Sequence, residues 1–318
     1  MQYTKFGKTG LKVSRICLGC MTYGAPDRGN HIWTLGETES RPFIKEALDN
    51  GINFFDTANV YSDGSSEEIL GRAIRDMAKR DDVVIATKVG MQMGSGDKGL
   101  SRNWIMRECD ASLRRLQTDV IDLYQAHRDD PDTPLEETAQ AFADLIKQGK
   151  VRAIGASNFT ATRLKSALEV SKAHNLPRYE SLQPLYNLVE RPAFEAELEP
   201  LCQAEQLGVI NYYALAAGFL TGKYRSEADL NKSPRGGGVK KYLDARGSGK
   251  RVLQALDNIA AIHKATPAQV ALAWLIARPS VTAPIASATN LEQLQDIIQA
   301  AQLRLTADDV KALNAASA

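Results

Sequence analysis

Short apolar runs alternate with amphipathic stretches along almost the whole chain, and this alternation limits the possible folds most strongly. Each run is short and bounded by polar residues, as expected of a strand buried on both faces of a parallel sheet. The runs lie at 15–20, 52–55, 83–87, 120–125, 151–155, 180–185, 208–213 and 282–286. They predict eight strands.

The stretches between these runs have helical periodicity and carry recognisable helix boundaries. They lie at 39–50, 66–79, 102–116, 134–148, 160–174, 192–207, 251–264 and 267–278, with another at 290–301 after the last strand. Ser101 and Thr160 are suited to be N-caps, Pro134 and Pro267 to the first helical turn, and Gly149 to a C-cap. The sequence therefore predicts a helix after nearly every strand.

Strict alternation of strands and helices, without a Pro/Ser-rich linker, predicts the α/β class. We expect one closed (β/α)8 TIM barrel that forms a single domain over residues 1–318. Two long connections, 22–35 and 218–249, are predicted to be βα loops that carry substrate and cofactor contacts. The tail at 306–318 predicts one extra C-terminal helix.

The composition excludes several classes of protein. A formal net charge of +1 over 318 residues argues against a nucleic-acid-binding protein, which normally carries a basic stripe. No apolar run reaches the roughly 18 residues of a membrane span, and the amino terminus shows no signal core. Cys17 and Cys20 form a C-x-x-C motif inside a predicted strand, and we interpret them as core residues rather than a redox or metal pair. We expect a cytoplasmic protein without a metal.

Three of the predicted strands deliver an ionisable residue at the same end. Asp56, Lys88 and His127 each follow an apolar run, and Tyr61 comes five residues after Asp56. The carboxyl ends of barrel strands meet at one rim, where the chemistry of such folds is found. We therefore expect these four side chains to share a site.

Together the four groups are suited to protonating an alkoxide. A tyrosine hydroxyl, with a pKa of about 10, is a poor acid at neutral pH, and a nearby ammonium is expected to lower that pKa. Asp56 would hold Lys88 charged, and His127 could donate a hydrogen bond to a carbonyl oxygen. Carbonyl reduction by hydride delivery requires this equipment. Singly, Asp56 could cap a turn, Lys88 could be a solvated strand end and His127 a surface residue, but their recurrence at successive strand ends favours catalysis.

Several segments resemble motifs of the aldo-keto reductase family, in its bacterial and potassium-channel-β-like branch. The resemblance covers essentially the whole chain, and the motifs occur in the order of the family. They are Phe55-Asp56-Thr57-Ala58-Asn59-Val60-Tyr61, Ala86-Thr87-Lys88-Val89, Asp122 to His127, Ile154 to Phe159, and Gly218 to Tyr224. This resemblance implies an enzyme that uses NADP(H) to reduce small aldehydes or ketones to alcohols.

The resemblance also implies a role for each matching residue. Tyr61 would be the general acid, Lys88 and Asp56 the pair that tunes it, and His127 the residue that orients the substrate. Cofactor contacts would come from Asp56, Ser157, Asn158, Gln183, Tyr212, Leu215, Ala217, Gly218, Lys223, Ser287, Ala288, Thr289, Asn290 and Gln293. Trp33, Arg128 and Tyr213 are expected near the substrate. A Rossmann cofactor site is not supported, because no strand is followed by G-x-G-x-x-G.

Some alternatives remain open from the sequence. NADP(H) is the preferred cofactor, but NAD(H) is possible, because Thr289 and Asn290 stand where many relatives carry a cation; Arg225, Arg235 or Arg246 could supply that charge. Arg128 could favour an anionic carbonyl substrate or form a salt bridge with Asp129 or Asp132. The alternative functions are a redox-sensing regulatory protein of the channel-β type and a barrel isomerase or lyase without nicotinamide. The oligomeric state is not predicted.

Overall fold

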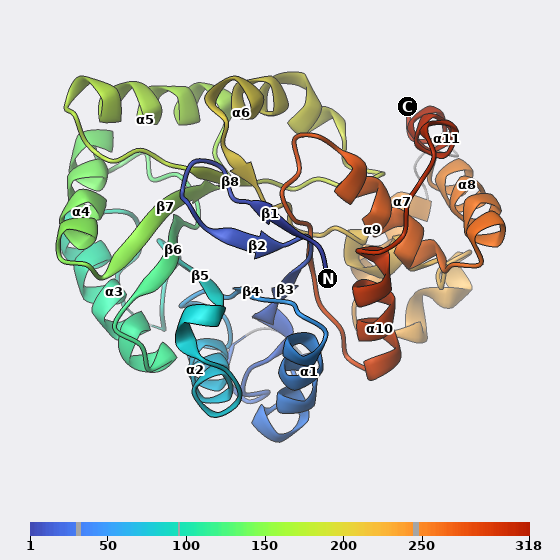
Figure 1. Cartoon of the computed structure of the whole chain (residues 1–318), viewed down its shortest axis with the longest axis horizontal. Helices are drawn as coiled ribbons and strands as arrows, with labels where there is room; N and C mark the ends of the chain where they lie inside the picture. Colours follow the sequence, from blue (N-terminus) through green and yellow to red (C-terminus); the bar gives the residue numbers. More distant parts are fainter. Residues whose placement is uncertain (30–32, 95, 244–247) are drawn as a thin grey trace.

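Eight parallel strands form one sheet, in the order β10-β3-β4-β5-β6-β7-β8-β9 (Figure 1). The computed structural model describes residues 1–29, 33–94, 96–243 and 248–318. The strands are β3 (Cys17–Gly19), β4 (Phe54–Asp56), β5 (Val84–Val89), β6 (Ile121–Ala126), β7 (Val151–Ser157), β8 (Ser181–Gln183), β9 (Gly208–Val209) and β10 (Ile285–Ala286). Each overlaps one of the eight predicted runs, so the eight predicted strands are confirmed, with bounds that differ by a few residues.

Hydrogen bonds between the two ends of this sheet close it into a barrel. The backbone N–H of Thr282 donates to the carbonyl of Val209 at 2.9 Å, and that of Ile285 donates to the carbonyl of Asn211 at 3.0 Å. These bonds join the segment leading into β10 to the segment around β9. The fold is therefore the predicted (β/α)8 TIM barrel.

Helices surround the barrel (Figure 1). They are α1 (Glu37–Asp49), α2 (Ser65–Met77), α3 (Arg102–Leu116), α4 (Leu135–Lys147), α5 (Ala161–Ala173), α6 (Glu199–Glu205), α8 (Ser248–His263), α9 (Pro267–Ala277), α10 (Leu291–Ala300) and α11 (Ala307–Ala316). Side-chain oxygens of Ser101 and Thr160 accept hydrogen bonds at the starts of α3 and α5, as predicted. Pro267 begins α9, but Pro134 lies one residue before α4 rather than inside its first turn. Gly149, with φ of +72°, follows the C-cap of α4.

An amino-terminal hairpin that the sequence did not predict closes one end of the barrel. Its strands, β1 (Tyr3–Lys5) and β2 (Lys12–Ser14), are antiparallel and lie across the centre of the view in Figure 1. Phe6 and Val13 are fully buried among inward-facing residues of the barrel, and the ring of Phe6 lies 5.5 Å from that of Phe54. The hairpin therefore leaves only the opposite end of the barrel open.

The long connection between β9 and α8 is built from short turns. Three 3-10 segments, at Ala216–Thr221, Glu227–Lys232 and Gly236–Gly238, are followed by the short helix α7 (Lys240–Leu243). The predicted helix at 192–207 begins with one π-helical turn, Phe194–Leu198, before α6. We refer to residues 218–243 as the late loop.

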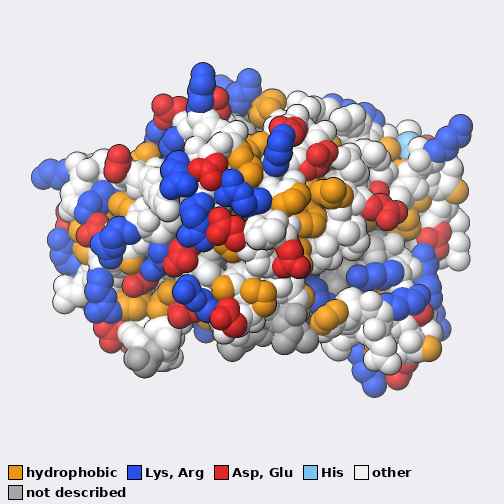
Figure 2. All heavy atoms as spheres, turned by 90° about the horizontal axis from the view of Figure 1, so that it is seen from below, with side chains coloured by type: hydrophobic (Ala, Val, Ile, Leu, Met, Phe, Trp, Pro, Cys, Tyr) orange, Lys and Arg blue, Asp and Glu red, His pale blue; other side chains and the backbone are white. Residues whose placement is uncertain are grey.

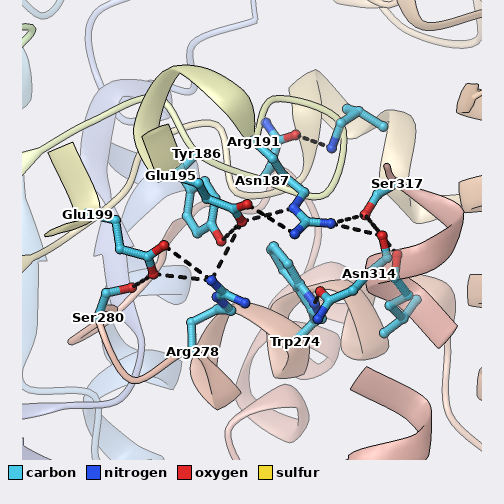
Figure 3. A network of polar contacts seen from close by, with 12 residues as sticks. Tyr186, Asn187, Arg191, Glu195, Glu199, Trp274, Arg278, Ser280, Asn314 and Ser317 are labelled. Atoms are coloured by element: carbon cyan, nitrogen blue, oxygen red, sulfur yellow. Dashed lines mark hydrogen bonds and ion pairs between the residues drawn. The ribbon is translucent and has the colours of Figure 1, made fainter. Parts of the chain in front are cut away.

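The predicted C-terminal helix α11 is present and is fixed by a polar network around Trp274 of α9 (Figure 3). The buried indole N–H of Trp274 donates to the side-chain oxygen of Asn314 at 2.9 Å. The guanidinium groups of Arg191 and Arg278 each lie 5.6 Å from the Trp274 ring. Arg191 also donates to both carboxylate oxygens of Glu195 and to the backbone carbonyl of Asn314. The network ties α11 to α9 and to the segment after β8.

The surface carries charges of both signs, as expected from the formal net charge of +1, and the cysteines are buried. Basic and acidic side chains are interspersed over the face shown in Figure 2. Cys17 and Cys20 are buried free thiols, which confirms their interpretation as core residues, and the described residues contain no group of His, Cys, Asp or Glu able to hold a metal. Within the described ranges no single helix is long and apolar enough to cross a membrane. Taken together, α8 and α9 have the necessary length and composition, but the chain bends by 94° between them.

Candidate active site

A cavity of about 730 Å³ lies at the carboxyl ends of the barrel strands. Its walls come from the strand ends, from the late loop and from the starts of α9 and α10. All but three of the residues that the sequence analysis assigned to a site line this cavity; the exceptions are Lys88, Ala288 and Asn290. The structure thus gathers most of these residues around one cavity at the carboxyl ends of the strands.

Lys88 lies beneath the cavity floor and joins two of the predicted catalytic residues. Its Nζ donates to Oδ1 of Asp56 at 2.5 Å, to the backbone carbonyl of Thr57 at 2.8 Å and to the hydroxyl of Tyr61 at 3.2 Å. Lys88 is fully buried, and Asp56 is 3% exposed. Adjacent strands β4 and β5 bring these residues together, and Tyr61 reaches them from the turn after β4.

The second carboxylate oxygen of Asp56 is held by two amides. Gln125 Nε2 donates to it at 3.1 Å and Gln183 Nε2 at 3.0 Å. Sequence reasoning did not include Gln125 in the site. Its place was detectable, because it lies beside Lys88 in the register of β5 and β6. Asp56 thus has partners for both of its oxygens.

The net shift of the Tyr61 pKa differs in direction from our expectation. Burial raises the pKa of Tyr61 above its ordinary value, and the ammonium of Lys88 only partly offsets this rise. Burial lowers the pKa of Lys88. The charge of Asp56 and the contact with Tyr61 raise this pKa by more than burial lowers it, so the net shift is upward. Tyr61 is therefore a protonated phenol beside a permanent ammonium.

His127 faces Tyr61 and is uncharged at neutral pH. Their ring centroids are 5.8 Å apart in an edge-to-face arrangement. Burial, followed by the charges of Lys88 and Arg128, lowers the pKa of His127 well below its ordinary value. Its Nδ1 atom is buried without a hydrogen-bond partner among the described residues. A neutral imidazole can still donate one hydrogen bond.

Ser157, Asn158 and Tyr212 form a hydrogen-bonded chain along one wall. Tyr212 donates to Oδ1 of Asn158 at 2.8 Å, and Asn158 donates to the backbone carbonyl of His127 at 2.9 Å and to Ser157 Oγ at 3.1 Å. Ser157 in turn donates to the backbone carbonyl of Gln183 at 3.0 Å. Asn158 has φ of +57°, a left-handed conformation that Asn tolerates better than most residues. The wall is therefore a fixed polar surface.

The backbone after β9 turns sharply at the cavity edge. Ala216, Ala217 and Gly218 have successive φ values of +49°, +56° and +95°. Leu215, Ala217, Gly218 and Lys223, which were expected to contact the cofactor, all line the cavity. A Cβ added at Gly218 would lie 3.3 Å from Cε of Lys223, so the absence of a side chain lets Lys223 approach this turn.

The far end of the cavity includes Ser287, Thr289 and Gln293 but not two of their predicted neighbours. Ala288 is buried, and its backbone carbonyl accepts from the hydroxyl of Tyr23 at 3.3 Å. Asn290 is the N-cap of α10, with its side-chain oxygen 2.9 Å from the N–H of Gln293. Residues 266–268, at the start of α9, and Asp296 complete this end. Sequence reasoning missed them because no local motif marks them.

Trp33, Arg128 and Tyr213 line the cavity together with Arg235 from the late loop. Arg235 Cζ lies 5.2 Å from the ring of Trp33 and 5.6 Å from that of Tyr213. Asp129 pairs with Arg163 at 2.8 Å and not with Arg128. Of the other cations considered for the cofactor, Arg225 pairs with Asp257 and does not line the cavity, while Arg246 lies outside the described residues.

Comparison with known proteins agrees with the barrel fold. Residues 15–318 match the sequence model of the aldo/keto reductase family. The chain is 37% identical to an uncharacterized oxidoreductase, YrpG, of Bacillus subtilis, over 99% of this chain and 95% of that protein. It is 34% identical to versiconal hemiacetal acetate reductase of Aspergillus parasiticus, over 98% and 96%. It is also 36% identical to a probable voltage-gated potassium channel subunit beta of Arabidopsis thaliana, over 94% and 91%.

These similarities extend over nearly the full length of each protein. A barrel with ionisable groups at its carboxyl rim and relatives of these kinds define an oxidoreductase. The chain belongs to the aldo/keto reductase family.

Proposed function

We propose that this protein uses NADP(H) to reduce aldehydes or ketones to alcohols, with Tyr61 as the general acid. The observation that carries the proposal is the contact of 3.2 Å between the Tyr61 hydroxyl and Lys88 Nζ at the cavity wall. His127 stands across the same cavity. A carbonyl oxygen between Tyr61 and His127 would meet one proton donor and one hydrogen-bond donor.

The lining residues fit a nicotinamide dinucleotide in an extended arrangement. The polar wall of Ser157, Asn158 and Gln183 offers amide and hydroxyl groups to a carboxamide, and Tyr212 offers a ring to a flat heterocycle. Lys223 offers a cation to the pyrophosphate. The start of α10, where backbone N–H groups lack helical partners, lies at the other end. When bound, the reduced nicotinamide supplies the hydride.

Proton transfer is assigned to the residues of this chain. The Tyr61 phenol is protonated at neutral pH, as an ordinary tyrosine is, and burial raises its pKa further, so it holds a proton ready for the oxygen of the substrate. The phenolate that remains after transfer would be stabilised by Lys88, which stays charged because Asp56 is bonded to it. Neutral His127 would donate its N–H to the same substrate oxygen, and so hold the carbonyl carbon at a fixed position.

The test is the absorbance of the reduced cofactor, followed with a panel of aldehydes for the wild type and for Tyr61→Phe. We expect the variant to lose on the order of 10² to 10⁴ in kcat while binding cofactor as before, because only the proton donor is removed. Fluorescence titration with NADPH and then NADH measures binding and tests the preference for NADP(H) over NAD(H). Wild-type turnover in Tyr61→Phe, with chemistry rate-limiting, would overturn the assignment.

A second candidate function is a nicotinamide-binding regulatory protein of the channel-β type, whose turnover is incidental. The similarity to the potassium channel beta subunit of Arabidopsis thaliana favours it. Tight cofactor binding with negligible reduction of every carbonyl tried would support this function and not the first. A nicotinamide-free isomerase or lyase would instead require that neither NADPH nor NADH binds. For either function we expect a cytoplasmic location.

A further inference from the structure

We propose that the substrate carries an anionic group, carboxylate or phosphate, which Arg235 binds together with Arg128 at the substrate end of the cavity. This inference rests on the proposed reductase function and deepens it. It follows from three features of the structure: the pairing of cations in the late loop, the position of Arg235 between two aromatic rings, and the engagement of the acidic residues near Arg128.

The cations of the late loop divide into two groups. Those that do not line the cavity have carboxylate partners: Arg225 with Asp257 at 2.7 Å, Lys232 with Asp229 at 2.7 Å, Lys240 with Glu227 at 3.7 Å and Lys241 with Glu190 at 2.5 Å. Lys223 and Arg235 line the cavity, and neither has a carboxylate partner among the described residues. Among the described residues, the late-loop cations without a carboxylate partner are therefore the two that line the cavity.

Aromatic contacts hold Arg235 in place without using its hydrogen-bond donors. Its guanidinium lies over Trp33, from the connection after β3, and over Tyr213, from the segment after β9. Aromatic rings interact with a guanidinium through its charge, which leaves the planar array of N–H groups available. Such an array binds a carboxylate or phosphate through two parallel hydrogen bonds.

Arg128 adds a second charge that has no carboxylate partner among the described residues, and the two acidic residues directly after it are engaged elsewhere. Asp129 accepts two hydrogen bonds from Arg163, at 2.8 and 3.0 Å. Asp130 accepts from the backbone N–H of Leu100 at 2.7 Å and from Thr133 at 2.6 Å. Arg128 itself lines the cavity beside His127, and its charge contributes to the lowered pKa of that histidine.

The carboxylates in the cavity wall should not repel an anion bound at the substrate end of the cavity. Among the described lining residues the carboxylates are Asp56 and Asp296. Asp56 is neutralised by Lys88 and bonded to two amides, and Asp296 accepts from Gln269 at the far end. Arg235 contacts Tyr213, whose ring lies 5.4 Å from that of Tyr212, so its charge lies at the same end as the proposed proton donor.

The experiment compares pairs of carbonyl compounds in which one member carries an anionic group and the other does not. With saturating NADPH, kcat/KM is measured for 4-carboxybenzaldehyde and its methyl ester, and for glyceraldehyde 3-phosphate and glyceraldehyde. We expect the wild type to prefer the anion of at least one pair, and the preference to fall on the order of tenfold in Arg235→Gln and further in the double variant with Arg128→Gln. The pair that responds distinguishes carboxylate from phosphate.

Arg225→Gln is the matched control, because it removes a cation of the same loop that is paired with Asp257 and lies outside the cavity. It should retain the wild-type preference. Equal efficiency for charged and neutral partners in the wild type would overturn the inference while leaving the reductase intact. A loss of NADPH affinity in Arg235→Gln without a change in preference would also overturn it, since Arg235 would then bind the cofactor phosphate. Absence of turnover on all four compounds would instead reject the reductase.

Discussion

The Lys88 amine lies 2.5 Å from a carboxylate oxygen of Asp56, and both side chains are almost completely buried. Two charges removed from water are tolerable only when each has close partners. Asp56 meets this need with Lys88, Gln125 and Gln183, while Lys88 also donates to the backbone of Thr57. The pair is therefore both a structural element of the barrel and the support for the Tyr61 hydroxyl.

Asp56→Asn should lower both the free energy of unfolding of the protein and its rate of carbonyl reduction. The change leaves the ammonium of Lys88 buried without its anion, and breaking one side of a buried pair costs about 3–5 kcal/mol. Urea denaturation measures the free energy of unfolding. Asp257→Asn is the control, because it breaks the partly exposed pair with Arg225 and should cost about 1 kcal/mol or less. Equal losses in the two variants would contradict the role of the buried pair.

Lys88→Met should slow carbonyl reduction and shift the decline of activity on the alkaline side to higher pH. The phenol of Tyr61 donates a proton, so activity declines as pH rises through the Tyr61 pKa. Burial raises that pKa and Lys88 lowers it, so removing the ammonium leaves the rise unopposed. Measurement of kcat/KM against pH, with circular dichroism to check folding, tests this. A decline that moves to lower pH would show that another group titrates.

Stability should fall on mild acidification because of His127. Its pKa in the folded protein is well below the ordinary value, owing to burial and to the charges of Lys88 and Arg128. Below about pH 6.5 the unfolded chain gains a proton at this position that the folded chain does not, so the free energy of unfolding drops as pH falls. The limiting slope is about 1.4 kcal/mol per pH unit. Urea titrations across this range should show a smaller slope for His127→Gln than for the wild type.

Gly71→Ala should destabilise the contact between α2 and α3. An added Cβ at Gly71 would lie 2.5 Å from the backbone carbonyl of Leu116, and backbone cannot move aside as a flexible side chain can. The clash should outweigh the gain of up to about 1 kcal/mol that Ala normally brings to a helix. Thermal unfolding compares this variant with Gly237→Ala, where a Cβ meets nothing within 4 Å. A higher melting temperature for Gly71→Ala would be the opposite result.

The barrel could be predicted from the sequence because its signals are local. Most residues of the inner strands are buried on both faces of the sheet, so these strands are rich in apolar residues, as in 84–89 and 121–126, which are buried throughout. The hairpin at the amino terminus gave no such signal. Its first strand, Tyr3–Lys5, is largely exposed, and only Phe6 and Val13 nearby enter the barrel.

Site residues at the carboxyl end of a strand could be predicted from the sequence. Those that reach the cavity only through the packing of distant segments could not. Asp56, Lys88 and His127 are marked by their positions at the carboxyl ends of β4, β5 and β6. The start of α9 lines the cavity through its packing in the assembled fold, and no pattern in residues 266–268 shows this. The net pKa of Tyr61 could not be predicted either, since the burial that dominates it is a property of the assembled walls.

The way the barrel closes has a consequence for its synthesis. Ring closure pairs residues 209–211 with 282–285, so a nascent chain that ends within α9 has made seven of the eight inner strands but lacks the last. Until β10 leaves the ribosome, β3 and β9 present unpaired backbone groups, which are templates for wrong association. A ribosome that stalls within this interval therefore holds the form of the chain most in need of a chaperone.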